Sequence, residues 1–204
     1  MKPIKQNKTF AHVKSEAKLA RQTLIIEAAE RVFAVKPFNK VSIRDIAKEA
    51  GISHASIYRY FPDQQSLFVE AFIQGAGEID VTLEGLIDNT KSPDILKVSD
   101  AYVTYLMDND QYFRMMTHFM LDGSLSAEKI EKLNAAERRV IDHFDRMFQK
   151  MKKPEPVRQL SHAFFAALNG VLITFRNYPG RTPKAVRQHM LNIARVIARS
   201  FSTV

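Results

Sequence analysis

The amino-acid sequence predicts an all-α fold, and three observations lead to this prediction. Glycine and proline are scarce, at 7 and 8 of 204 residues, which disfavours a turn-rich β architecture. Apolar residues recur along most of the chain at the period of amphipathic helices, and no strand-like alternation is sustained. Apolar side chains make up 46% of the sequence, which is enough for a sizeable core.

Residues 1–15 are expected to form a basic, flexible arm without any acidic residue. They contain no apolar run of the kind found in a secretory signal. The most apolar stretch of the chain, 164–175, is too short to span a bilayer, so we expect no membrane partner. The sequence has no cysteine, which suits a cytoplasmic protein and excludes a thiolate metal site.

The first predicted helix carries an apolar stripe with helical spacing, formed by Ile25, Ala28, Ala29, Val32 and Phe33. Pro37 ends it within a break at 34–40. A second helix begins after Ser42, a predicted N-cap with Asp45 as capping-box partner, and Gly51 supplies the left-handed residue that ends it.

A third helix is predicted from its cap at Ser53 to about Tyr60, and a fourth from Asp63 to about Asp88. Residues 89–94 have the composition of a linker. Turn residues then separate five more predicted helices, at about 94–108, 110–121, 126–151, 155–177 and 183–201.

Positive charge is concentrated in the first third of the chain. Up to Pro62 the sequence has 12 Lys and Arg against 5 Asp and Glu, whereas the remainder has 18 against 17. A basic head on a nearly neutral body is typical of a polyanion-binding protein, although a solvated basic face is the simpler alternative.

Residues 41–68 have the pattern of a helix-turn-helix, in which two short helices cross at a steep angle. Ala47 is small enough for the two backbones to approach, and Gly51 makes the turn four residues later. The space between the helices is expected to be filled by four side chains, those of Ile46, Ala50, Ile52 and Ile57.

This segment closely resembles the DNA-binding domain of the TetR family over about residues 20–72. The positions that match the family pattern are Ser42, Arg44, Asp45, Ile46, Ala47, Ala50, Gly51, Ser53, Ala55, Ser56, Tyr58, Tyr60 and Phe61. The resemblance implies a helix-turn-helix DNA-binding domain over 16–64, followed by a helical ligand-binding and dimerisation domain over 65–204. Pro37 departs from the pattern, where the family usually has glycine. Gln64 departs too, because it replaces a phosphate-binding lysine.

The resemblance and the geometry of the major groove give candidate DNA-binding residues. The start of the third helix, 53–56, is expected to face base edges, whereas Tyr58 and Tyr60 suit flanking phosphates. The alternative is that the two tyrosines pack on the first helix. The full candidate set is Ser42, Arg44, Lys48, Ser53, His54, Ala55, Ser56, Tyr58, Arg59, Tyr60 and Gln64.

The body is rich in aromatic and methionine side chains, which suit an adaptable apolar cavity. By resemblance, its central helices enclose an inducer pocket, although core packing is the favoured explanation at any single position and only the collective enrichment indicates a cavity. The candidate ligand-binding residues are Tyr102, Tyr105, Phe113, Met116, Phe119, Met120, Met147, Phe165 and Asn169.

The last two helices are expected to form a homodimer interface, as the resemblance implies. We expect it to contain two apolar stripes: Leu160, Phe164, Leu168, Val171 and Phe175 on one helix, and Val186, Met190, Ile193, Ile197 and Phe201 on the other. A small-residue face that permits close helix approach adds Ala163, Ala166, Ala167 and Gly170.

The sequence therefore predicts a homodimeric repressor that an apolar or aromatic small molecule releases from double-stranded operator DNA. The alternative is a DNA-binding protein of the same fold that answers to a protein partner or to no inducer. No phosphate-binding glycine loop or catalytic motif is present, so we expect neither an enzyme nor a cofactor. His118 and Asp122 lie four residues apart, but such a pair is more often a helix-face hydrogen bond than a metal site.

Overall fold

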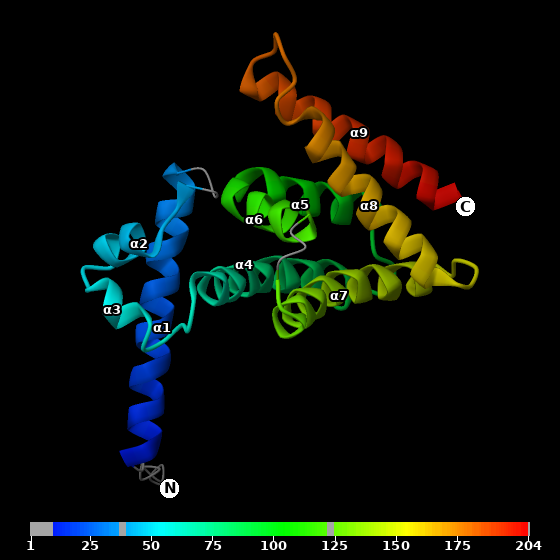
Figure 1. Cartoon of the computed structure of the whole chain (residues 1–204). Helices are drawn as coiled ribbons and strands as arrows, with labels where there is room; N and C mark the ends of the chain where they lie inside the picture. Colours follow the sequence, from blue (N-terminus) through cyan, green and yellow to red (C-terminus); the bar gives the residue numbers. More distant parts are fainter. Residues whose placement is uncertain (1–9, 37–39, 122–124, 204) are drawn as a thin grey trace, which may run out of the picture. The chain divides into compact units, whose positions relative to one another are not determined.

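The computed structural model describes residues 10–36, 40–121 and 125–203, and within these ranges the regular structure is α-helical. The predictions at Pro37 and at the 122–124 break lie outside the described residues. Figure 1 shows the helices, which are α1 (Phe10–Val35), α2 (Ile43–Glu49), α3 (His54–Ile57), α4 (Gln64–Ile87), α5 (Ile95–Asp108), α6 (Asp110–Leu121), α7 (Ala127–Lys150), α8 (Val157–Phe175) and α9 (Pro183–Thr203).

The chain divides into two compact units, residues 1–71 and 72–204, and α4 contains residues of both. The first unit is built around α1, whose predicted apolar stripe is buried; α1 packs on α2, and α2 packs on α3. Phe33 and Phe68 make an edge-to-face contact there, with ring centroids 4.8 Å apart. The first turns of α4 therefore belong to the core of the first unit, beyond the predicted boundary at residue 64.

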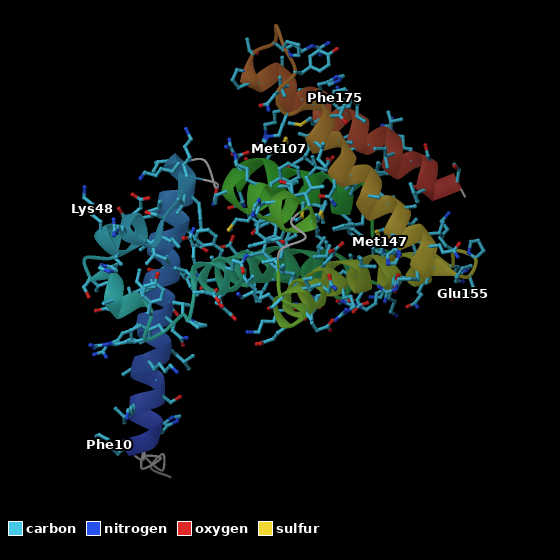
Figure 2. The ribbon with its side chains drawn as sticks, in the orientation of Figure 1. Phe10, Lys48, Met107, Met147, Glu155 and Phe175 are labelled. Carbon is cyan, nitrogen blue, oxygen red and sulfur yellow. The ribbon has the colours of Figure 1, made fainter. Side chains whose placement is uncertain are left out.

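Helix α1 begins earlier than expected. Residues 10–15 of the predicted flexible arm are helical, and residues 1–9 lie outside the described ranges. No proline or glycine interrupts Phe10–Val35, so nothing in this stretch breaks the ladder of backbone hydrogen bonds. Figure 2 places Phe10 at the end of α1 that extends past α2 and α3, and its side chain is exposed.

The predicted ends of α2 are confirmed in detail. The Ser42 hydroxyl accepts a hydrogen bond from the Asp45 amide at 3.3 Å, and the Asp45 carboxylate accepts one from the Ser42 amide at 3.0 Å. At the other end, Gly51 has φ +67°, and the Ile52 amide donates back to the Ala47 carbonyl at 3.0 Å. This Schellman pattern turns the chain sharply towards α3.

Helix α3 is shorter than predicted, because it ends at Ile57 and residues 58–60 form a turn. The Ile57 carbonyl accepts hydrogen bonds from both the Tyr60 and Phe61 amides, so the last turn tightens. Pro62 then disfavours helical backbone at Phe61. Ile46 and Ile57 fill the space between α2 and α3 as predicted, but Ile52 does not, because its side chain is 37% exposed.

The second unit is a bundle in which α5 packs on α9, α7 on α8, and α8 on α9. Its helix bounds agree with the predicted ones to within about two residues. Phe144 and Phe148 of α7 meet Phe164 of α8 edge to face, with centroids 5.1 and 5.8 Å apart. Among residues 10–36, 40–121 and 125–203, none of the helices combines the length and apolar character needed to cross a bilayer.

The predicted dimer stripes on α8 and α9 are partly wrong. Five of their members are buried in the core of this chain itself: Phe164, Leu168, Val171, Val186 and Met190. Periodicity identified the apolar faces, but α5 and α7 already cover them. The small-residue face is different, because Ala163 and Ala166 are exposed and a Cβ on Gly170 would meet no atom within 4 Å.

Candidate DNA-binding surface and small-molecule pocket

Two ion pairs join α1 to α2 in the first unit. Arg31 reaches Glu49 at 2.6 Å, and Lys36 reaches Asp45 at 2.5 Å. The hydrogen bond from Lys36, followed by those from Ser42, lowers the pKa of Asp45 to about 2. These contacts neutralise two of the basic residues and hold α2 against α1.

Three other cations of this unit are left uncompensated. Arg44, Lys48 and Arg59 are exposed, and none forms an ion pair with a residue that the structure describes. Figure 2 labels Lys48 on α2. The α2–α3 surface therefore carries net positive charge that no described carboxylate neutralises.

The start of α3 presents a mixed polar surface. His54 and Ala55 are exposed, whereas the two serines are engaged with each other. The Ser53 hydroxyl caps the helix by accepting from the Ser56 amide at 3.2 Å, and the two hydroxyl oxygens are 2.8 Å apart. His54 and Ala55 are therefore the residues of this turn most available to a partner.

The two tyrosines differ in their surroundings. Tyr58 is 51% exposed. Tyr60 is half-buried against α1, where its hydroxyl accepts from Arg21 Nη1 at 3.3 Å and its carbonyl from Gln22 at 3.4 Å. A hydroxyl that accepts from Arg21 still has its own proton to donate. Arg21 was absent from the predicted set, because nothing in the local pattern links residue 21 to residue 60.

Two predicted DNA contacts hold the fold together. The Ser42 hydroxyl is hydrogen-bonded to the Asp45 carboxylate at 2.8 Å. The side-chain amide of Gln64 donates a hydrogen bond from Nε2 to the Val41 carbonyl at 2.9 Å, which links the start of α4 to the segment before α2. A phosphate at Gln64 would have to compete with this bond.

A partly open cavity lies within the second unit. Five aromatic rings and two methionines dominate its wall. The lining residues come from α4 to α8 and are Phe72, Tyr102, Tyr112, Met116, Phe119, Met120, Ile130, Leu133, Asn134, Glu137, Val140 and Phe165.

Five of the nine predicted ligand-binding residues line this cavity: Tyr102, Met116, Phe119, Met120 and Phe165. The other four are placed elsewhere. Tyr105 donates its hydroxyl to the Gly75 carbonyl at 2.5 Å, and Met147 is fully buried on α7. Phe113 lies under the Arg176 guanidinium, 5.1 Å from its ring centroid, at a separate hollow. Asn169 accepts a hydrogen bond from the Tyr102 hydroxyl at 3.3 Å, so it positions a residue of the cavity wall.

The contribution of α7 to the cavity wall was not predicted from the sequence. Ile130, Leu133, Glu137 and Val140 recur at helical spacing and form one wall. The same spacing is equally typical of core packing, and a glutamate in the stripe resembles a solvent-facing residue. Phe72 and Tyr112 were also missed; they stack with centroids 4.9 Å apart and an interplanar angle of 4°.

The close approach of Tyr112 to α4 depends on Gly75. A Cβ built on Gly75 would lie 2.8 Å from Cδ2 of the Tyr112 ring, which is closer than real contacts allow. Because Tyr105 also donates to the Gly75 carbonyl, two tyrosines from α5 and α6 fix this point of α4. These two contacts therefore fix the position of the aromatic wall of the cavity relative to α4.

A buried polar cluster lies between α4 and α7. His143 is 6% exposed, with Nε2 3.7 Å from Asp80 Oδ1 and Nδ1 2.6 Å from Arg146 Nη2. Arg146 in turn pairs with Asp88 at 2.8 Å. Burial, followed by the charge of Arg146, lowers the pKa of His143. Within the described ranges, no three acidic or histidine side chains come together as a metal site.

Residues 25–71 match the model of the family described as "Bacterial regulatory proteins, tetR family". The chain is 43% identical over 49 residues to the HTH-type regulator YuxN of Bacillus subtilis, and 30% identical over 74 residues to EthR of Mycobacterium tuberculosis. These matches cover 24% and 36% of this chain, but only 17% and 34% of the two relatives. A longer match, 26% identical and covering 68% of both chains, is to the nucleoid occlusion factor SlmA of a Marinomonas species.

Solved structures resemble the chain over most of its length. A TetR-family regulator from Mesorhizobium loti superposes with a TM-score of 0.69, at 18% identity over 90% of this chain and 96% of that one. FadR of Bacillus subtilis in complex with stearoyl-CoA gives 0.67, at 20% identity over 84% and 96%. A regulator from Saccharomonospora viridis in complex with choline gives 0.67, at 19% identity over 87% and 95%. At these identities the likeness establishes the fold.

Proposed function

We propose that this chain, which carries the N-terminal domain of the TetR family of bacterial regulatory proteins, is a dimeric transcription repressor that binds operator DNA in the cytoplasm. The observation that carries the proposal is the exposed, uncompensated charge of Arg44, Lys48 and Arg59 on a capped helix-turn-helix. Exposed cations on such a motif are placed to bind phosphates beside the major groove. The proposal involves neither catalysis nor a cofactor.

The proposed division of roles on this surface follows from exposure. His54 and Ala55, at the start of α3, read base edges, and Ala55 is small enough to meet a thymine methyl group. Tyr58 and Tyr60 donate their hydroxyls to flanking phosphates, and Arg21 supplies charge beside Tyr60. Ser42 and Gln64 act by holding α2 and α4 in place.

The proposed dimer forms through the exposed small-residue face of α8. Ala163, Ala166 and Gly170 leave room for close helix approach, and Ile173 beside them is 62% exposed. Val196 of α9 is also 59% exposed. A twofold axis would bury these apolar surfaces and would pair two recognition helices, as a palindromic operator requires.

The proposed effector is a small molecule that occupies the cavity of the second unit and lowers the DNA affinity. The cavity wall includes Phe72 of α4 and Tyr112, which packs against Gly75 of the same helix. A ligand that displaces these rings acts directly on α4, which also contributes Leu67 and Phe68 to the core of the first unit. FadR and the S. viridis regulator, which share the fold, are each described with a small molecule bound.

Selection from a random duplex pool tests the proposal. The purified chain should enrich a site with two half-sites related by twofold symmetry, about 34–36 Å apart from centre to centre. If the bound fraction shows no enriched sequence after several rounds, the chain is not an operator-binding regulator.

A second candidate keeps the DNA surface but removes the small molecule. The match to SlmA over 68% of both chains favours this alternative, in which a protein partner or no effector controls binding. Reciprocity separates the two, because an inducer that lowers DNA affinity must itself bind more weakly, by the same factor, to DNA-saturated protein. Equal ligand affinities with and without operator would favour the second candidate.

A further inference from the structure

The wall of the cavity contains one carboxylate among rings and aliphatic side chains. Apart from Glu137 and Asn134, its lining residues are aromatic, methionine or aliphatic, and none of them is lysine, arginine or histidine. The cavity is therefore apolar with a single source of negative charge.

Glu137 is half-buried, and no neighbouring side chain among the described residues neutralises its carboxylate. Its side chain forms no ion pair or hydrogen bond with any residue in the described part of the chain. Burial raises the pKa of Glu137, and His162 of α8, the charge that opposes this shift, is itself exposed. A ligand that filled the cavity would remove more water from this carboxylate. Such a ligand would therefore have to supply a positive charge or a hydrogen-bond donor.

The rings around Glu137 suit the same kind of ligand. Phe72 stacks on Tyr112 and meets Phe119 edge to face, with centroids 4.9 and 5.9 Å apart. On another side of the wall, the Tyr102 and Phe165 centroids are 6.1 Å apart. The faces of aromatic rings attract cations, most strongly where water is excluded. The aromatic rings and the Glu137 carboxylate therefore both favour a positively charged ligand.

We infer that the cavity binds an organic cation: an aromatic or alkyl body that carries one amine or quaternary ammonium group, held near Glu137. This inference rests on the proposed function, because it names the chemical class of the effector. An anionic ligand is disfavoured, since its charge and that of Glu137 would repel each other at low dielectric.

Three naphthalene probes that differ mainly in charge test the inference. They are 1-naphthylmethylamine as the cation, 1-naphthalenemethanol as the neutral analogue, and the carboxylate of 1-naphthaleneacetic acid as the anion. Calorimetric titration of the full chain at about pH 7 should rank them in that order, with the amine at least about tenfold tighter than the alcohol. Equal affinities, a preference for the anion, or no binding of the amine at millimolar concentration would overturn the inference.

Two variants locate the charge effect. Glu137→Gln should weaken the amine about tenfold or more and leave the alcohol unchanged. Glu131→Gln removes the same charge from an exposed position on α7 that pairs with Arg138, and should change neither affinity. Equal losses in both variants would mean that the overall charge of the protein, and not Glu137, is responsible. If Glu137→Gln does not fold, the ranking of the probes on the unmodified chain still decides.

Binding of an operator duplex by each variant without any probe separates this inference from the proposed function. Glu137→Gln should bind DNA as the unmodified chain does, because Glu137 lies in the second unit. If the unmodified chain binds DNA but does not rank the probes as expected, the cationic ligand alone is refuted. Absence of DNA binding by the unmodified chain, with the ranking present, refutes the regulator and leaves the cation site standing.

Discussion

Asp45 illustrates how a single residue serves both fold and surface. Its carboxylate accepts from the Ser42 amide and hydroxyl and from Lys36, which together hold its pKa near 2. Because this pKa lies below the unfolded value, the stabilisation is present above about pH 4 and is lost as the pH falls towards 2. The cap that starts α2 therefore contributes this stabilisation in full at neutral pH.

Substitutions at neighbouring residues of the candidate DNA-binding surface should alter DNA binding in different ways. Arg44→Ala should weaken binding to all duplexes alike and reduce the salt slope of a dimer by about two, because it removes one phosphate contact per protomer. His54→Ala should change the preferred sequence, since base contacts specify. Selection from random duplexes and salt titration check both. Lys97→Ala, which removes an exposed cation of α5, is the control. A changed site preference in Arg44→Ala would contradict this division of labour.

His143 predicts a pH dependence of stability. The groups that face it are Asp80, Glu84 and Asp88 of α4 and Arg146 of α7. Burial and Arg146 outweigh the carboxylates, so the folded-state pKa of His143 lies below the unfolded value of about 6.5. The folded state thus binds this proton less readily than the unfolded state, and the free energy of unfolding falls as the pH drops below about 6.5.

Chemical denaturation between about pH 7.5 and pH 5 checks this prediction. The unmodified chain should lose more stability across the range than His143→Gln, whose side chain does not titrate. The other histidines contribute equally to the pH dependence of both proteins, so their contribution cancels when the two slopes of unfolding free energy against pH are compared. If the two proteins have the same pH dependence, His143 is not protonated on unfolding in this range.

At the scale of the element, the turn between α2 and α3 depends on backbone conformation. Gly51 has φ +67° and Gly85 is an exposed residue within α4, yet a Cβ on either would meet no atom within 4 Å. Gly51→Ala should therefore destabilise the chain by about 1 kcal/mol or more, from left-handed strain alone. Gly85→Ala should stabilise it by about 0.5–1 kcal/mol. Thermal unfolding of the pair decides, and equal shifts would show that the turn does not require glycine.

A second prediction at this scale concerns the exposed face of α8 and the formation of the dimer. Gly170→Leu should leave the single chain folded, because a Cβ at this position meets no atom within 4 Å, but should break the proposed dimer seam. Light scattering should then report 23.3 kDa, the mass of one chain, and operator binding should weaken. Ala127→Leu, at an exposed position at the start of α7, is the control. A Gly170→Leu variant that stays dimeric and binds normally would place the interface elsewhere.

At the scale of the whole molecule, local chemistry and tertiary packing were predictable to different degrees. Ser42, Asp45 and Gly51 act through neighbours close in sequence, so their roles follow from the sequence itself. The stripes on α8 and α9 were correctly identified as apolar, but periodicity does not reveal which element covers an apolar face. Phe164 and Val186 are covered within the chain.

The candidate sites show the same limit. The aromatic and methionine character of the cavity could be predicted from composition, and Met116 and Phe165 lie in its wall. The place of Glu137 in the cavity wall could not be predicted, because five helices from distant parts of the sequence form that wall. Likewise the bond between Arg21 and Tyr60 joins residues 39 positions apart.

The salt dependence of duplex binding tests the central claim most directly. A dimer that places Arg44, Lys48 and Arg59 of each protomer on phosphates makes at least six such contacts. Fluorescence anisotropy with the selected operator should show the affinity falling about a thousandfold or more between roughly 50 and 200 mM salt. The triple variant Arg44→Ala, Lys48→Ala, Arg59→Ala should lose most of that slope. An affinity that stays flat across the salt range, or a slope unchanged in the triple variant, would contradict the claim that this surface binds operator DNA.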